Sequence, residues 1–280
     1  GERQLRRLFQ RQLGVSPKIL VRTQRLHFAR KLLEETQLSM TEVAFSSGYT
    51  SVRRFNAEVK TYTGMIPQEI RRRSKNNHQD LASNLTLRLA YKPPYDWYAM
   101  LHFLKGRLLP GLESVEDDQY YRVVLINNQV GKIQVGHEPG FLVLTISSHL
   151  STEIGFIAQR VRRMFDLDLD PEAMLSVFRG TILETITHKY SGLRLPRAWD
   201  GLELATRAIL GQQVSIKATN TFLRRLINQY GVSIFSPLSG RQGNYFPSAQ
   251  ILAKANLQSL GLPKARAYTL TALAQAYVSG

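Results

Sequence analysis

Apolar residues recur every three to four positions through the first 70 residues, which is the spacing of amphipathic helices. Leu5, Leu8 and Phe9 share one face of the first such segment. Gly14 is predicted to end it, and Ser16-Pro17 to begin the next as N-cap and first helical residue. The pattern then predicts a helix to about residue 35 and two short helices over 40–46 and 51–61.

Gly48 separates the two short helices, and the second of them is basic on its open face. A short helix, a turn and a basic helix are typical of a helix-turn-helix unit, whose second helix enters the DNA major groove. A helical hairpin with a solvated basic face is the alternative. A second basic helix at 2–11, separated from 51–61 by a helix close in length to one duplex turn, favours DNA binding.

The pattern changes after a polar stretch at 71–83, which we interpret as a linker. Alternating positions predict strands over 85–91, 120–126, 130–135 and 141–147, with helices over 96–107 and 151–165. This order predicts an antiparallel α+β layer. From Pro171 the pattern is helical again, over 199–211, 215–230, 248–259 and 265–278, and residues 231–247 are predicted to form a loop. The fold class is therefore multidomain and mainly α, with one α+β layer.

The net charge of the chain indicates what kind of partner it binds. The 280 residues carry 37 Lys and Arg against 21 Asp and Glu, a net charge of +16, and residues 1–80 alone hold 16 bases and 7 acids. Such an excess indicates a polyanionic partner, with nucleic acid first and an anionic membrane surface second. No apolar run is long enough to span a bilayer. The absence of cysteine excludes disulfides, thiolate nucleophiles and Cys-ligated metal sites.

Residues 1–73 resemble the DNA-binding domain of AraC-type regulators, in the version found in Ada-type alkylation-response regulators. The matching text is ERQLRRLFQRQLGVSP followed by QRLHFARKLLEETQLSMTEVAFSSGYTSVRRFNAEVKTYTGMIPQEIRR. The resemblance implies an all-α double helix-turn-helix with recognition helices at 2–11 and 51–61. Its first unit is incomplete, because the helix expected before Glu2 and the upstream methyl-acceptor domain are missing. The implied DNA contacts are Gln4, Arg6, Arg7, Ser51, Arg53, Arg54 and Asn56.

A second resemblance covers residues 85–280. YKPPYDWYAMLHFLKGR, YSGLRLPRAWDGLELATRAILGQQVS and QSLGLPKARAYTLTALA are similar to 3-methyladenine DNA glycosylase II proteins of the AlkA type. It implies a TATA-binding-protein-like α+β domain at 85–166, after a linker at 74–84. The N-terminal half of an all-α helix-hairpin-helix glycosylase domain follows at 167–280. The family's hairpin and catalytic aspartate are expected beyond residue 280, so the chain is interpreted as a fragment truncated at both ends.

The second resemblance also implies site residues. Gln213 matches the wedge that fills the gap left by a flipped base, where the family's best-known pattern has leucine, and a polar residue of a simple loop is the alternative. Gln212 is predicted to contact the DNA or the local backbone. Phe103 matches a pocket aromatic that stacks an alkylated base, with a plain core position as the alternative. Arg107 is expected to be a surface ion-pair partner.

None of the remaining acidic residues has the setting of a catalytic acid. Glu203 is interpreted as a surface partner of Arg207, one helical turn away, and Asp200 as a helix cap. Asp170 is expected to cap the helix at Pro171 rather than to join Asp166 and Asp168 in a calcium site. No catalytic residue, metal site or cofactor is therefore assigned. An apolar face around Leu262, Leu270, Leu273 and Val278 is expected to lack packing partners.

The resemblances together predict an alkylation-damage repair protein with a transcription-regulator module. It would excise alkylated purines by hydrolysing the N-glycosidic bond, in base excision repair. The chain alone is expected to be inactive. The alternative is an AraC-family regulator whose glycosylase-like part only binds damaged DNA. The implied partner is double-stranded DNA, through the major groove and through the minor groove at the damaged base. A monomer in the bacterial cytoplasm, associated with the nucleoid, is expected.

Overall fold

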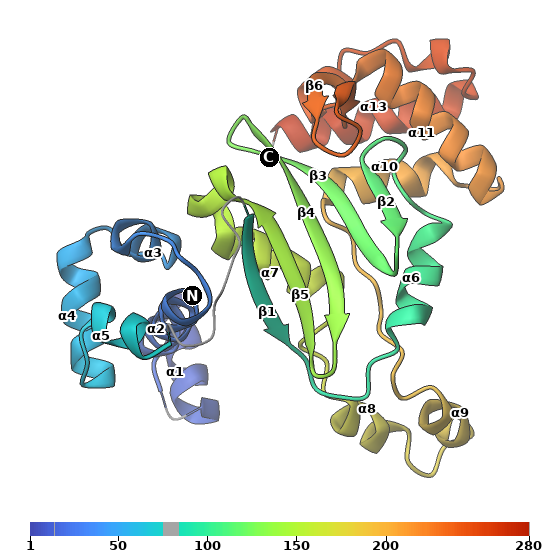
Figure 1. The fold of residues 1–280 in the computed structure, drawn as a ribbon. Helices are drawn as coiled ribbons and strands as arrows, with labels where there is room; N and C mark the ends of the chain where they lie inside the picture. The colour runs from blue at the N-terminus through green and yellow to red at the C-terminus, as the bar shows by residue number, and fades with distance from the viewer. Residues whose placement is uncertain (14, 75–83, 280) are drawn as a thin grey trace. The chain divides into compact units, whose positions relative to one another are not determined.

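The computed structural model describes residues 1–13, 15–74 and 84–279 (Figure 1). The chain divides into two compact units. The first comprises Gly1–Leu87 with Ser147–Ile157, and the second Arg88–Ile146 with Ala158–Gly280. Among the helices described, none combines the length and the apolar character needed to cross a membrane.

Five helices make up most of the first unit. They are α1 (Glu2–Leu13), α2 (Pro17–Glu35), α3 (Met40–Ser46), α4 (Val52–Thr63) and α5 (Pro67–Ser74). The predicted start of α2 is confirmed, because the Ser16 hydroxyl accepts a hydrogen bond from the Ile19 N–H and Pro17 follows it. Gly64 ends α4 in the left-handed conformation, with φ +74°, which glycine adopts without steric cost. The predicted linker is partly wrong, since residues 71–74 belong to α5, and residues 75–83 lie outside the described residues.

The core of the first unit lies where α2, α3 and α4 meet. Leu32, Val43 and Phe55 are almost fully buried there, and the Tyr49 and Phe55 rings are in edge contact with centroids 5.5 Å apart. Residues 147–157 belong to this unit, in which Ser46 donates a hydrogen bond to the carbonyl of Ser151 over 2.8 Å. The α3–turn–α4 arrangement that the helical spacing predicts is therefore held together by its own core.

A five-stranded sheet is central to the second unit. Its strands are β1 (Asn84–Ala90), β2 (Glu113–Glu116), β3 (Gln119–Ile126), β4 (Gln129–Glu138) and β5 (Phe141–Ser147), in the order β1-β5-β4-β3-β2. Strands β2 to β5 pair as an antiparallel meander. The two-residue turns Asp117-Asp118 and Asn127-Asn128 have positive φ throughout, as such hairpin turns require. The predicted meander is confirmed, and β2 is an addition that the pattern did not reveal.

Helices α6 (Trp97–Lys105) and α7 (Ile154–Met164) share an aromatic contact with the sheet. The Phe165 ring, just after α7, lies 5.6 Å from Trp97 and 5.5 Å from Tyr120 of β3, measured between centroids. The indole of Trp97 donates a hydrogen bond to the Asp118 carbonyl over 2.9 Å. A buried indole that finds a polar partner is typical of a core anchor.

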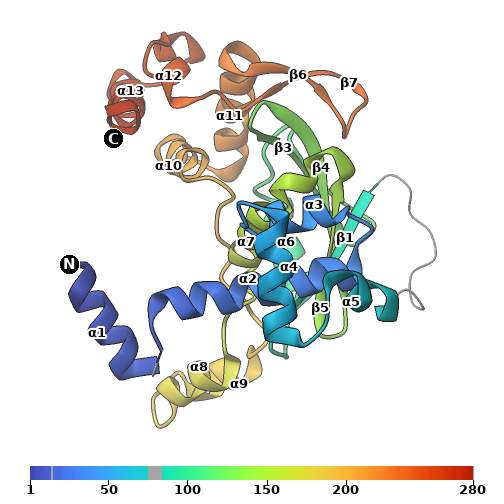
Figure 2. The ribbon, with the colours of Figure 1, turned by 90° about the vertical axis from the view of Figure 1, so that its left-hand side faces the viewer.

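The remaining elements form two groups, one at each end of the sheet (Figures 1 and 2). At one end lie α8 (Pro171–Phe178) and α9 (Glu184–Lys189). At the other lie α10 (Gly201–Leu210), α11 (Ile216–Tyr230), β6 (Val232–Ser236), β7 (Arg241–Tyr245), α12 (Ala249–Leu252) and α13 (Lys264–Ser279). Among the described residues, 3-10 turns are η2 (Ser148–Glu153) in the first unit and η3 (Leu257–Leu260) in the second. The predicted loop at 231–247 is wrong, because β6 and β7 pair there as an antiparallel hairpin.

The helices at the α10 end enclose a core of their own. Leu210, Leu223 and Leu252 are completely buried, and Leu112 and Val123 extend this cluster to the sheet. The expected unpartnered face is wrong for Leu262 and Leu270, which are 6% and 0% exposed because α13 packs against α10 and α12. Leu273 is partly buried and Val278 is 49% exposed.

Candidate nucleic-acid interface

The turn between α10 and α11 presents two glutamine side chains to solvent. Helix α10 ends at Leu210, and the Ser215 hydroxyl caps α11 by accepting a hydrogen bond from the Ala218 N–H. Between them Gln212 and Gln213 are exposed, and Gln213 has a φ of +55°. A non-glycine residue in this region is uncommon and is often found where a side chain is held for a function. The turn thus has the exposure and the fixed backbone that a protruding side chain needs.

Two features restrict the conformation of this turn, the close packing of α10 and α11 at Gly211 and a hydrogen bond from α13. At Gly211 a Cβ atom would lie 3.0 Å from the Arg207 carbonyl oxygen of α10 and 3.2 Å from the Thr219 hydroxyl of α11, so the two helices leave little room for a side chain there. The Arg266 guanidinium, from α13, donates a hydrogen bond to the Gln212 carbonyl over 2.7 Å. Sequence reasoning missed Arg266, because nothing in its local pattern connects it to a turn 54 residues earlier.

Phe103 lies on α6 and is 39% exposed. The Arg107 guanidinium lies over its ring, 3.9 Å from the centroid, and also donates a hydrogen bond to the Phe103 carbonyl. This exposure does not fit the plain core position, and Arg107 makes a cation–π contact in place of the expected ion pair. The role of Phe103 in a base pocket stays a prediction.

A hydrogen-bonded chain connects α6 to α10 and α11. Arg207 of α10 donates to the Asn220 side chain over 3.2 Å, and the Asn220 amide donates to the Gly106 carbonyl at the end of α6 over 3.3 Å. Helix α11 therefore links the helix that carries Phe103 to the helix that ends at the glutamine turn.

The expectation of Glu203 as a surface ion pair is wrong. Glu203 is 7% exposed, and both of its carboxylate oxygens accept hydrogen bonds of 2.6 Å from Arg122 of β3. Arg122 is 1% exposed and also pairs with Glu113, which accepts further hydrogen bonds from the Tyr120 hydroxyl and the Leu109 N–H. The partner of Glu203 lies 81 residues away in the sheet, which spacing within one helix does not indicate.

Opposite charges in this cluster shift the pKa values of its members in opposition to burial. Burial raises the pKa of the Glu203 carboxyl, and the Arg122 guanidinium offsets part of that rise. Burial alone would lower the pKa of Arg122, but the facing carboxylates of Glu203 and Glu113 raise it above its ordinary value. The cluster thus fastens α10 to β3 and leaves neither carboxylate facing solvent.

Other carboxylates near this end of the chain have structural partners. Asp200 caps α10 by accepting hydrogen bonds from the Leu202 and Glu203 N–H groups, and Asp170 caps α8, so both predicted caps are confirmed. Asp168 pairs with Arg162, and Asp166 lies 3.6 Å from Arg197. In the part of the chain that the structure describes, no three His, Asp or Glu side chains are placed to hold a metal ion.

Helix α4 of the first unit presents a cationic and polar face. Arg53, Arg54 and Asn56 are exposed on it. Ser51 is the N-cap, since its hydroxyl accepts a hydrogen bond from the Arg54 N–H. The Arg54 guanidinium donates to Glu58 over 3.1 Å, so Arg54 is tethered along the helix. On α1, the candidates Gln4, Arg6 and Arg7 are exposed, and Arg6 lies 3.5 Å from Glu2.

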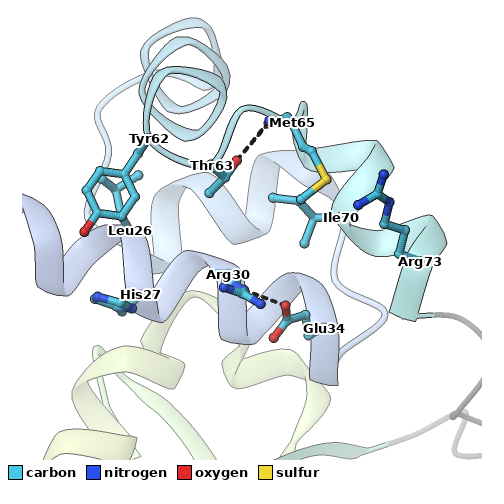
Figure 3. Close-up of a pocket in the computed structure, with 9 residues that line it drawn as sticks. All are labelled: Leu26, His27, Arg30, Glu34, Tyr62, Thr63, Met65, Ile70 and Arg73. Carbon is cyan, nitrogen blue, oxygen red and sulfur yellow. Dashed lines mark hydrogen bonds and ion pairs between the residues drawn. The ribbon is translucent and has the colours of Figure 1, made fainter.

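A pocket of about 410 Å³ lies between α2, α4 and α5 (Figure 3). Leu26 and Ile70 are the buried residues of its lining, and the His27 and Tyr62 rings meet edge to face 6.3 Å apart. The Thr63 hydroxyl accepts a hydrogen bond from the Met65 N–H, which orders the turn that follows α4. These contacts fix the C-terminal end of α4 and thereby the direction of its exposed face.

Two family models match the chain. The model described as a helix-turn-helix domain matches residues 1–73, and the model described as the AlkA N-terminal domain matches residues 86–200. The chain is 34% identical over 278 residues to a Mycobacterium tuberculosis protein named "Probable bifunctional transcriptional activator/DNA repair enzyme AlkA", covering 97% of this chain and 55% of that protein. This chain therefore spans about half the length of that curated relative.

Two further proteins each match about two thirds of the chain. The Escherichia coli protein named "DNA-3-methyladenine glycosylase 2" is 32% identical over 199 residues, covering 69% of this chain and 67% of that protein. The solved structure of a 3-methyladenine DNA-glycosylase from Archaeoglobus fulgidus superposes with a TM-score of 0.56 at 18% identity, covering 67% of this chain and 66% of that one. At that identity the likeness is one of fold.

Proposed function

This chain belongs to the AlkA-type DNA-3-methyladenine glycosylase family, in a form fused to an AraC-type helix-turn-helix domain, and on that premise we propose that it serves alkylation-damage repair. The two matched domains would join sequence-directed DNA binding to recognition of alkylated purines in base excision repair. The observation that carries this proposal is the exposed Gln212–Gln213 turn, held with a positive φ between two packed helices.

The proposed reaction is hydrolysis of the N-glycosidic bond of an alkylated purine. That bond cannot be reached within the base stack, so the base must be flipped out of the duplex. Gln213 would enter the minor groove and occupy the gap, while Phe103 would stack on the extruded base. The glutamine amide can hydrogen-bond the orphaned base, although it stacks less well than an apolar wedge.

The finer fold assignments belong to the same proposal. We interpret 1–73 as a double helix-turn-helix with an incomplete first unit, which would read the major groove as a monomer through α1 and α4. The domain at 85–166, after a linker at 74–84, would be TATA-binding-protein-like, and 167–280 would be part of a helix-hairpin-helix domain. Exposure of the candidate contacts on α1 and α4 supports the first of these assignments.

We further propose that these 280 residues alone do not excise bases. Glu203 and Glu113 are both paired with Arg122, and Asp200 and Asp170 cap helices, so each of these four carboxylates has a structural partner. The same observation favours the second candidate function for the chain by itself, which is binding of damaged DNA without catalysis. No organic cofactor is part of either proposal.

Incubation of the purified chain with alkylated duplex DNA tests both candidates. Released base and abasic sites should not exceed a no-protein control, while the chain should bind a duplex carrying an abasic-site analogue more tightly than an intact duplex. Release well above the control would refute the inactivity and call for a catalytic carboxylate within 85–280. Equal affinity for the two duplexes would contradict damage recognition itself.

A further inference from the structure

The hydrogen bond from Arg266 to the glutamine turn joins two helices that are distant in sequence. Arg266 lies in the first turn of α13, and its guanidinium donates to the Gln212 carbonyl over 2.7 Å. Helix α13 is itself immobilised, because Ala267, Leu270 and Ala274 are 4%, 0% and 0% exposed in the core it shares with α10. The donor therefore comes from a rigid element, although the acceptor lies in an exposed turn.

The acceptor is the group that governs the conformation of Gln213. The Gln212 carbonyl belongs to the peptide plane between Gln212 and Gln213, and the orientation of that plane sets ψ of Gln212 and φ of Gln213. The left-handed region is sterically unfavourable for a non-glycine residue, so an exposed turn without a further contact would relax from it. A hydrogen bond from a charged donor is about twice as strong as a neutral one and opposes this relaxation.

We propose that Arg266 is a positioning residue that fixes the Gln212–Gln213 peptide and so holds the Gln213 side chain ready to enter the duplex. This inference rests on the wedge role of Gln213 under the proposed function. Arg266 acts through the turn, and the side chain that meets the base gap is that of Gln213.

The test compares two 15–25-base-pair duplexes (a length of about two helical turns), one intact and one with a central tetrahydrofuran abasic-site analogue flanked by 2-aminopurine. The preference is the ratio of the two dissociation constants, so DNA affinity contributed equally to both duplexes by α1 and α4 cancels. The 2-aminopurine fluorescence at saturating protein reports unstacking at the site itself.

We expect Arg266→Ala to lower the preference by roughly tenfold, the scale of one charged hydrogen bond, and to reduce the 2-aminopurine signal. Gln213→Ala should do the same, and the double variant should be no worse than Gln213→Ala, because both changes remove one function. Arg266→Lys keeps a cationic donor and should restore most of the preference. Lys264→Ala is the matched control: it removes a charge from the same helix and should leave the preference unchanged.

The outcomes separate the two proposals. If Gln213→Ala keeps the full preference, the wedge role of Gln213 is contradicted, and so is the positioning role of Arg266, which depends on it. If Gln213→Ala loses the preference while Arg266→Ala keeps it, only the positioning role is overturned. A double variant whose loss equals the product of the single losses, or an Arg266→Ala loss matched by Lys264→Ala, would show that Arg266 acts as a separate charge. Melting curves of each variant verify that α13 stays folded.

Discussion

At the scale of single residues, the buried Arg122 connects the sheet to helix α10 in the second unit. It pairs with Glu113 beside it in the sheet and with Glu203 of α10, and all three side chains are almost fully buried. Removing Arg122 would leave two buried carboxylates without their cation, and removing either carboxylate would leave a buried guanidinium N–H without its acceptor. The cluster is therefore costly to break, even though an apolar replacement of the whole group could be tolerated.

We expect Glu203→Ala to lower the free energy of unfolding by about 1–3 kcal/mol, because the second nitrogen of the buried Arg122 would lose its acceptor while Glu113 still pairs with the first. Glu138→Ala is the matched control: its partner Arg88 is 56% exposed, and surface pairs contribute less than about 1 kcal/mol. Urea denaturation of both variants measures the difference. Equal losses would mean that the Glu203 carboxylate is solvated in solution.

The helical pattern placed Glu203 correctly on a helix but on the wrong side of it. Arg207, one turn away, suggested a surface pair, whereas Arg207 bonds to Asn220 and Glu203 faces the sheet. Local spacing identifies neighbours on one helix and carries no information on a partner from another element. The same reason explains why Arg266 was missed, while caps such as Asp200 and Asp170, whose partners lie within three residues, were predicted.

At the scale of elements, caps define where the helices of the first unit begin. Ser39 is the N-cap of α3. Its hydroxyl accepts from the Glu42 N–H over 3.1 Å, and the Glu42 carboxylate accepts from the Ser39 N–H over 2.8 Å. This reciprocal pair is a capping box.

Ser39→Ala should lower the free energy of unfolding by about 1 kcal/mol, the usual contribution of an N-cap. Thr41→Ala, two residues along on the exposed side of the helix, should change it by less than about 0.5 kcal/mol. Thermal melts of the two variants at neutral pH give the comparison. A larger loss for Thr41→Ala would place the start of α3 elsewhere.

Glu42 adds a pH dependence to the same element. The hydrogen bond from the Ser39 N–H lowers the pKa of the Glu42 carboxyl below its ordinary value. A lowered pKa contributes stability that is complete above the ordinary value and is lost as the pH falls through the folded-state pKa. Melts between pH 7 and pH 3 should therefore show a smaller acid-induced loss for Glu42→Gln than for the unaltered chain. Parallel curves would contradict this assignment.

Helix α4 allows its two neighbouring arginines to be compared. Arg53→Ala should weaken binding to duplex DNA more than Arg54→Ala, because Glu58 already neutralises part of the Arg54 charge at 3.1 Å. Lys18→Ala, on α2 and outside the two proposed recognition helices, is the control and should have the smallest effect. Fluorescence anisotropy at fixed salt measures the order, and a reversed order of the two arginines would argue against this face of α4 as the DNA-contacting one.

Element prediction succeeded where a pattern repeats and failed where it is short. The meander β3–β5 alternates over seven to ten residues, and it was recognised. The hairpin β6–β7 has five residues in each strand, and β2 has four. In β6 only Ile234 and Ser236 are buried. Buried and exposed positions therefore alternate over too few residues to distinguish a strand from a loop.

At the scale of the whole molecule, charge is concentrated in the first 80 residues, with 16 bases and 7 acids. A protein that neutralises phosphates releases counterions, so its affinity for DNA falls as salt rises. We expect the logarithm of the association constant for duplex DNA to fall steeply and linearly with the logarithm of the salt concentration. Binding that barely changes between about 50 and 200 mM salt would contradict an electrostatic DNA contact.

Exposed apolar side chains gather at the α8–α9 end of the second unit, and the last prediction concerns them. Ile182 is 95% exposed, Leu195 71% and Ile186 56%. Such a group on a free surface favours self-association, although its members contribute little to folding. Ile182→Ser combined with Ile186→Thr should therefore reduce light scattering at high protein concentration, while the free energy of unfolding changes by less than about 0.5 kcal/mol. Ile133→Thr, at a position with 0% exposure in β4, is the contrast. It should lower the free energy of unfolding by more than about 1 kcal/mol, because a hydroxyl replaces part of a packed apolar side chain. A comparable loss from the α8–α9 variant would show that these side chains are packed in solution.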